Sequence, residues 1–250
     1  MVRSADGGRT WQKVINRHFW RMDEDEETHT LYAGNYEKTR PRLQPATLFA
    51  STDDGTTWRT VFTDNQLDHI HSVRCDPQYH RVYLSAGDGS FRGQAWSGDN
   101  GGTWQWINRG GMQGHTDLAF TDQYVVWGSD DHWGRILLGP RDTVGDGKTV
   151  LKGRGQDIWF VVAEGSQAYA GTRCLPEARE SSAFLLASSD GGRTWRKLLR
   201  HSAPAGDEAC MASESRRLST EGWLFFTTTD GKAYRVRRTP GASPENHFVR

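Results

Sequence analysis

Two histidines separated by one residue, His69 and His71 in the string DHIHSV, are the sharpest chemical signal in this 250-residue sequence. Side chains two apart on a β-strand point to the same side, so both imidazoles can face one pocket. An imidazole titrates near neutrality and can remove or donate a proton at physiological pH. We predict that His69 and His71 are catalytic; the alternative is that they only pack between neighbouring sheets.

Other reactive residues stand at the starts of hydrophobic runs or in the loops that follow the next run. Tyr36 is the third predicted catalytic residue, and either Tyr36 or His69 would donate a proton to the leaving oxygen. One of three arginines, Arg40, Arg92 or Arg173, is expected to clamp a substrate carboxylate, because a planar guanidinium can make two parallel hydrogen bonds. The predicted substrate-binding residues are His18, Arg40, Asp88, Arg92, His115, Asp130, Asp131, Trp133 and Arg173. Other polar residues at the starts of these runs or in these loops are Lys38, Gln113, His132, Gln156, Glu177, Arg179 and Glu208.

Repeated strings show which elements must position these residues. Four similar octets occur in the chain, SADGGRTW (4–11), STDDGTTW (51–58), SGDNGGTW (97–104) and SSDGGRTW (188–195). Their aspartates are 47, 46 and 91 residues apart, and the last gap is close to two periods of about 46. A shortened copy, VGDGKTV around Asp146, stands where the missing octet is expected.

Each period contains four short hydrophobic runs with alternating character, bounded by Gly, Asp and Pro, which indicates four strands. In residues 69–110 these runs read HIHSVRCDP, RVYLSAGDG, GQAWSGDNGGTW and QWINRG. No run of ten or more residues carries a helical stripe. Four strands repeated at this period are typical of a β-propeller. We predict an all-β propeller of five to six four-stranded blades, with residues 1–250 forming one domain or a fragment of a larger ring.

The S-x-D-x-G-x-T-W octets resemble the Asp-box, or BNR, repeat of the sialidase-like β-propellers, and the resemblance covers nearly the whole chain. It implies a hairpin between the third and fourth strands of each blade. Asp and Gly form tight turns, and Ser and Thr hydroxyls can bond to turn groups, so the octet aspartates are interpreted as structural. The loops at the opposite ends of the strands, which carry the histidines, are then expected to bind the ligand.

The resemblance to sialidases does not extend to their active site. Those enzymes need an arginine triad, a Tyr paired with Glu, and an acidic Asp. Their F/Y-R-I-P segment is absent, and GRILLGP around Arg135 is in a different register. Sialidase activity is therefore not expected.

The blend of His, Tyr and Arg is more similar to the sites of propeller-fold polysaccharide lyases that act on uronate sugars. In such an elimination His71 would remove the proton next to the carboxylate, and a cation would stabilise the developing enolate. We predict a polysaccharide lyase or glycoside hydrolase acting on acidic glycans. The alternative is a non-catalytic module that binds a glycan or a protein through Phe91, Trp133 and Tyr36.

Composition excludes several classes of partner and site. Lys and Arg total 31 and so do Asp and Glu, so no duplex nucleic acid or anionic membrane is expected as a partner. The three cysteines, Cys75, Cys174 and Cys210, have no C-x-x-C spacing, which argues against a disulfide framework and a thiolate zinc site.

No cofactor or metal is expected. A further alternative is a metal site formed by His69, His71 and His115 with Asp88 or Asp130. The acidic run 23–27 is predicted to be a solvated loop. The start of the chain shows no signal-peptide core, and there is no 18-residue apolar run. This predicts a soluble chain, either cytoplasmic or secreted with its leader left out.

Overall fold

The computed structural model describes residues 1–37, 45–110, 115–131, 133–145, 147–153, 155–175, 182–204, 206–213 and 215–237. These residues form strands, turns and connections and contain no helix, as the sequence predicts. Consistently, none of them lies in a helix long and apolar enough to cross a membrane. The chain divides into two compact units, unit 1 (Met1–Gly114) and unit 2 (His115–Arg250).

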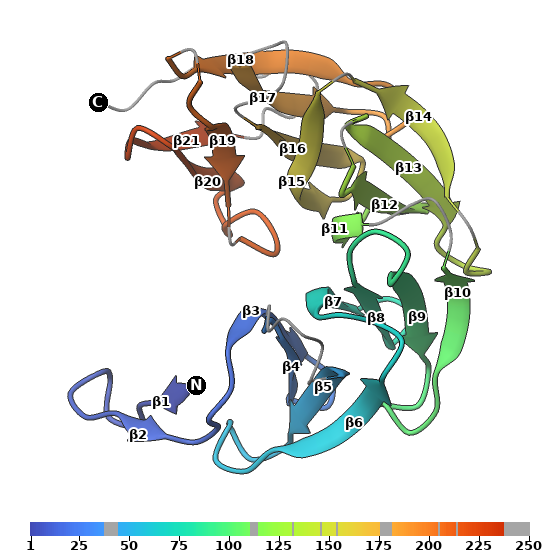
Figure 1. Ribbon diagram of the computed structural model, residues 1–250, viewed down its shortest axis with the longest axis vertical. Coiled ribbons are helices and arrows are strands. Elements are labelled where there is room, and N and C mark those ends of the chain that lie inside the picture. Colours follow the sequence, from blue (N-terminus) through green and yellow to red (C-terminus); the bar gives the residue numbers. More distant parts are fainter. Residues whose placement is uncertain are drawn as a thin grey trace. The chain divides into compact units, whose positions relative to one another are not determined.

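Unit 1 consists of a short hairpin followed by two four-stranded antiparallel sheets (Figure 1). The hairpin is β1 (Val2–Arg3) with β2 (Gln12–Lys13). The first sheet contains β3 (Phe19–Asp25), β4 (Thr30–Asn35), β5 (Ala46–Ser51) and β6 (Arg59–Asp64). The second contains β7 (Ile70–Asp76), β8 (Arg81–Ala86), β9 (Gly93–Ser97) and β10 (Gln105–Arg109). Strands pair in chain order within each sheet, and β3 packs against β7.

Unit 2 repeats the same four-strand order (Figure 1). One set is β11 (His115–Phe120), β12 (Tyr124–Ser129), β13 (Arg135–Pro140) and β14 (Lys148–Lys152). The next is β15 (Gln156–Glu164), β16 (Gln167–Cys174), β17 (Ser182–Ser188) and β18 (Arg196–Ser202). The last strands are β19 (Ala209–Ala212), β20 (Trp223–Thr228) and β21 (Ala233–Arg237), and β19 also pairs with the end of β16. The number of blades and the single-domain organisation stay predictions.

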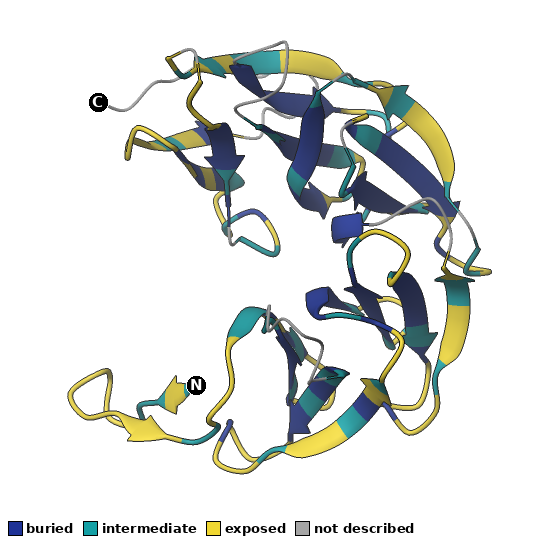
Figure 2. Ribbon diagram, viewed as in Figure 1, coloured by how far each residue is buried: buried dark blue, intermediate teal, exposed yellow. Residues whose placement is uncertain are grey.

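Burial changes systematically from the second strand of a set to the fourth. The second and third strands are mostly buried, whereas β6, β10, β14 and β18 are mostly exposed (Figure 2). A strand that is covered on both faces has apolar residues at successive positions. This explains why YVVW in β12 and LLAS in β17 do not alternate between apolar and polar residues. Among the described residues, unit 1 has one buried apolar cluster centred on its two sheets, and unit 2 has two.

A small residue recurs at the fifth position of each second strand, and within each unit a later first strand packs closely on the glycine: β7 on β4, β15 on β12 and β19 on β16. Gly34, Ser85, Gly128 and Gly171 occupy this position in β4, β8, β12 and β16. A Cβ added to Gly34 would lie 2.6 Å from Ile70 Cβ, and one added to Gly128 would lie 2.5 Å from Ile158 Cγ2. Glycine inside a strand is thus used for the close approach of two sheets.

A β-bulge interrupts the first strand of every set near its start. The pairing register shifts between Phe19 and Met22, between Ile70 and Ser72, between His115 and Asp117, and between Ile158 and Phe160. A bulge adds a residue to one strand and redirects the side chains beside it. In β7 the added residue is His71, so the bulge sets the direction of one predicted catalytic side chain.

The S-x-D-x-G-x-T-W octets are the turns between β1 and β2, β5 and β6, β9 and β10, and β17 and β18. In the second turn Asp53 Oδ1 accepts from Ser51 Oγ (2.8 Å) and Thr57 N (2.8 Å), while its Oδ2 accepts from Thr57 Oγ1 (2.7 Å). Gly55 N donates to Ser51 Oγ, and Trp58 Nε1 donates to Gly55 O. The other three turns repeat the serine and aspartate bonds. Both carboxylate oxygens are therefore used inside the turn, which supports a structural role. Asp146 lies outside the described residues.

Trp104 departs from this pattern and joins two sheets. Its Nε1 donates to Val61 O in β6 (2.8 Å) rather than to its own turn, and its ring contacts Phe62 edge to face. The third turn is therefore attached to the outer strand of the preceding sheet.

These turns predict a loss of stability in acid. Hydrogen bonds from the turn hold the pKa of the four octet aspartates at about 2, below the usual 3.8. At Asp190 partial burial raises the pKa, but the bonds from Thr194 and Ser188 lower it more. Because the folded pKa is depressed, this stabilisation is present above about pH 4 and is lost as the pH falls towards about 2.

We expect Asp190→Asn to lower the melting temperature at pH 7 by a few degrees and to flatten its decrease between about pH 4 and 2. Asp207→Asn, an exposed aspartate of unit 2 outside these turns, is the control. Thermal melts across this pH range measure both, and an unchanged acid slope in Asp190→Asn would contradict the assignment.

The acidic run 23–27 differs from its prediction. Asp23 and Asp25 are buried in β3 rather than solvated. Asp23 Oδ2 accepts from Cys75 N of β7 (2.9 Å), and Asp25 accepts from Glu27 N and from Thr28 Oγ1. A carboxylate can be buried when such donors replace its water, and Asp23 thereby links the two sheets of unit 1.

Candidate functional site

Backbone hydrogen bonds at one end of the unit 1 sheets bring the predicted loops together. Tyr36 N, after β4, donates to His18 O before β3 (2.8 Å), and Gly87 N, after β8, donates to His69 O before β7 (2.8 Å). Asp88 follows Gly87 directly. In both sheets the segment that enters the first strand is therefore hydrogen-bonded to the loop that follows the second strand. The predicted site needs these two segments to lie close together.

His69 and His71 meet through their imidazole rings. Their Nε2 atoms are 2.7 Å apart, and both side chains are only 2% exposed. Asp88 Oδ1 lies 3.2 Å from His71 Nε2 and 3.8 Å from His69 Nε2, while the Asp88 side chain is 42% exposed. Three atoms able to accept a proton or a cation therefore converge on one point, at a place where only the carboxylate reaches solvent.

Two aromatic rings complete this arrangement. Tyr36 contacts His69 edge to face, with ring centroids 4.3 Å apart, and Trp20 contacts both Tyr36 (4.7 Å) and His71 (5.8 Å). Both aromatic residues are half-buried. We call Trp20, Tyr36, His69, His71 and Asp88 the histidine cluster.

The other predicted site residues of unit 1 are close in sequence to members of the histidine cluster, but their exposure differs. His18 is exposed, and its backbone N–H donates to Glu37 Oε1 (3.3 Å). Arg92 is half-buried and follows the exposed Phe91 in the same loop as Asp88. Arg40 and Lys38 lie outside the described residues, as do Gln113, His132, Glu177 and Arg179.

His115 of unit 2 is buried at the start of β11. Its ring packs on Trp127 of β12, with centroids 5.1 Å apart. Within unit 2 the structure therefore places this predicted substrate-binding histidine against the Trp127 ring.

Asp131 and Trp133 of unit 2 belong to the loop after β12. Asp131 Oδ1 accepts from Ser129 Oγ (2.9 Å) and from Trp133 N (3.1 Å), and its Oδ2 accepts from the guanidinium of Arg135. Trp133 is 50% exposed, with the Lys152 ammonium 4.3 Å above its ring. Asp131 thus organises this loop, and Trp133 is its accessible surface.

Arg173 forms an ion pair within unit 2. Its Nε and Nη2 donate to Asp157 Oδ2 at 3.2 and 2.5 Å, and its guanidinium stacks 4.0 Å from the Trp159 ring. Burial alone would lower the pKa of Arg173, but the Asp157 bond and charge, with a smaller contribution from Asp130, raise it. The guanidinium therefore already binds a carboxylate of its own chain.

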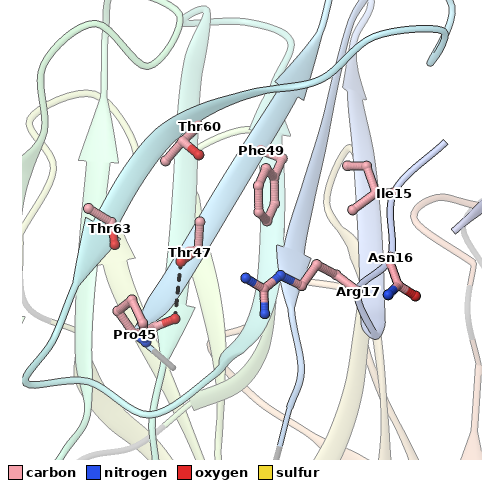
Figure 3. Close-up of a pocket in the computed structure, with 8 residues that line it drawn as sticks. All are labelled: Ile15, Asn16, Arg17, Pro45, Thr47, Phe49, Thr60 and Thr63. Carbon is pink, nitrogen blue, oxygen red and sulfur yellow. Dashed lines mark hydrogen bonds between the residues drawn. The ribbon is translucent and has the colours of Figure 1, made fainter. Parts of the chain in front are cut away.

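Among the residues that the structure describes, a separate cavity of about 700 Å³ in unit 1 is lined by none of the predicted site residues. Figure 3 shows Arg17 extending from the segment before β3 toward β5, and Thr47 Oγ1 donates to Pro45 O (3.1 Å). The described part of its lining offers shape, three threonine hydroxyls and the Arg17 guanidinium. Its lining residues are Ile15, Asn16, Arg17, Pro45, Thr47, Phe49, Thr60 and Thr63.

Trp20 is the member of the histidine cluster that sequence reasoning missed. It stands two residues after His18, as His71 stands two residues after His69, so the repeat itself contains the signal. The threonines of the cavity carry no comparable signal, because they are ordinary strand residues.

Comparison with known proteins now gives the fold. No protein-family model and no curated protein matches the chain. Among solved structures, the GH74 xyloglucanase from Xanthomonas campestris aligns with a TM-score of 0.65 at 17% identity, over 94% of this chain and 40% of its own. The chain has a β-propeller fold.

Two further structures with the same fold are found in complexes. YCF48 bound to D1 peptide gives a TM-score of 0.55 at 13% identity, over 97% of this chain and 73% of its own. The nidogen/laminin complex gives 0.57 at 14% identity, over 82% of this chain and 72% of its own. The β-propeller described here therefore resembles both a glycan-directed enzyme and proteins seen with protein partners, and it spans less than half of the xyloglucanase.

Proposed function

We propose that this β-propeller is a carbohydrate-recognition module whose glycan binds at the histidine cluster. The observation that carries the proposal is that the half-buried rings of Trp20 and Tyr36 and the partly exposed Asp88 carboxylate all lie against the same histidine pair. A sugar ring presents C–H groups that pack on Trp20 and Tyr36, and hydroxyl groups that bond to the Asp88 carboxylate. Arg92, on the loop of Asp88, favours a glycan that carries carboxylates, such as a uronate polymer.

A catalytic role receives less support from the same geometry. In the corresponding elimination His71 would remove the proton next to a uronate carboxylate, and Tyr36 or His69 would protonate the leaving oxygen. Both imidazoles are 2% exposed and their Nε2 atoms face each other, so a substrate carbon has poor access to either. The alternative of a protein ligand is retained as an outcome of the test, since two structures of this fold contain one.

Glycan binding is tested by titrating uronate-containing and neutral polysaccharides into the protein and monitoring for an unsaturated product by ultraviolet absorbance. We expect binding of the uronate polymer without product formation. Trp20→Ala and Asp88→Ala are each expected to weaken the affinity roughly tenfold or more. Trp11→Ala, which removes an exposed tryptophan of unit 1 away from the histidine cluster, is the matched control and should bind like the wild type.

Three outcomes would contradict this proposal. Accumulation of unsaturated product that disappears in His71→Ala would show an enzyme. Affinity that survives both Trp20→Ala and Asp88→Ala would place the glycan elsewhere. Capture of a protein ligand by the same surface, with no glycan bound, would show a protein-binding propeller.

A further inference from the structure

We propose that His69, His71 and Asp88 form a binding site for one divalent transition-metal ion, of which Zn²⁺ is the reference case. One ligand atom from each residue, the two Nε2 atoms and a carboxylate oxygen, lies within 4.8 Å of the others. The proposal concerns a resident ion and does not depend on glycan recognition.

The distances between these atoms are close to those that a metal imposes. With Zn–N and Zn–O bonds of about 2.0–2.1 Å in a tetrahedron, neighbouring ligand atoms lie roughly 3.3–3.4 Å apart. Asp88 Oδ1 is 3.2 and 3.8 Å from the two nitrogens, on either side of this value. The two nitrogens are 2.7 Å apart and must separate by about 0.6–0.7 Å to reach this spacing, a shift that rotation of the two rings can supply.

Proton counting gives an independent reason. A neutral imidazole carries one N–H, so at most one proton can lie between Nε2 of His69 and Nε2 of His71. A cation at the centre is attracted to all three lone pairs at once. Imidazole and carboxylate are the ligands that zinc and similar ions take in proteins.

The surrounding fold holds the ligands in place. His71 is the added residue of the β7 bulge, His69 O is bonded by Gly87 N, and Phe91 N donates to Asp88 O (3.0 Å). The Tyr36 ring packs on His69. Rings fixed in this way lose little freedom when a metal binds. Three protein ligands leave a coordination position for water or for a ligand oxygen.

The test is direct titration of the tag-free, chelator-treated protein with Zn²⁺ by calorimetry, and with Co²⁺ by visible absorption. We expect one equivalent of Zn²⁺, and a Co²⁺ spectrum of low coordination number that Zn²⁺ displaces. His71→Gln should abolish the Co²⁺ spectrum. Asp88→Asn, isosteric and at a partly exposed position, should fold normally and weaken Zn²⁺ binding at least about tenfold.

His80→Gln is the matched control, because it removes an exposed imidazole that pairs with Glu27 (2.5 Å) elsewhere in unit 1. It should bind both ions like the wild type. Failure of the wild type to bind one equivalent of either ion would overturn the proposal. So would an unchanged affinity in the His69→Gln, His71→Gln double variant. Either result leaves glycan recognition through Trp20 and Asp88 to be decided by its own titration.

Discussion

Gly87→Ala is expected to dismantle the histidine cluster while leaving most of the β-sheet structure intact. Gly87 has φ +81°, a left-handed conformation that costs an alanine about 1–2 kcal/mol. A Cβ there would overlap the backbone oxygen of Phe91 and lie 2.5 Å from its carbonyl carbon and 2.8 Å from Arg92 Cα. Backbone atoms cannot rotate away as a side chain can, so the loop between β8 and β9 must move, and Asp88 moves with it.

Two measurements test this expectation. Chemical denaturation should show a loss of roughly 2–4 kcal/mol in the free energy of unfolding, and titration should show loss of Zn²⁺ and glycan binding. Gly89→Ala is the matched control, since Gly89 has φ +58° in the same loop but an added Cβ meets nothing within 4 Å. Equal effects of the two substitutions would mean that φ alone, and not the Phe91 overlap, determines the loss.

The repeated architecture could be predicted because its signals are local. Gly, Asp and Pro interrupt each hydrophobic run, and the octets recur at a constant spacing, so the strand order of residues 69–110 was predictable from the residues alone. The solved β-propellers show the same fold. The gathering of His69, His71, Tyr36 and Asp88 followed from the same repeat, because equivalent loops of neighbouring sheets lie at the same end of their strands.

The features that could not be predicted from the sequence depend on contacts between segments that are far apart in the chain. Asp23 was expected to be solvated, and its burial depends on Cys75 N, which is 52 positions away. The cavity beside Phe49 depends on residues 15–17 lying beside β5 and β6. Arg173 was predicted as a clamp for a substrate carboxylate, and no local pattern indicates that Asp157 would pair with it.

Gly171→Ala is expected to be the most destabilising single-methyl change in unit 2. Gly171 stands in β16 where three strands meet, and an added Cβ would overlap the Phe160 ring and lie 2.8 Å from Met211 O of β19. Phe160 is fully buried, so its ring has no open space to enter. Overpacking of this kind costs roughly 2–4 kcal/mol and should lower the melting temperature by about 5–12 °C.

The comparison that isolates the cause uses Gly145→Ala and a double variant. An added Cβ at Gly145 approaches only Pro140 carbons, at 3.8 Å, so this control should melt within about a degree of the wild type. Phe160→Leu shortens the opposing side chain and should recover part of the stability lost in Gly171→Ala, a favourable coupling between the two positions. The overlap with Met211 O remains in the double variant, so recovery is expected to be incomplete. A melting temperature of Gly171→Ala equal to that of Gly145→Ala would show that β15, β16 and β19 are not packed as closely as described.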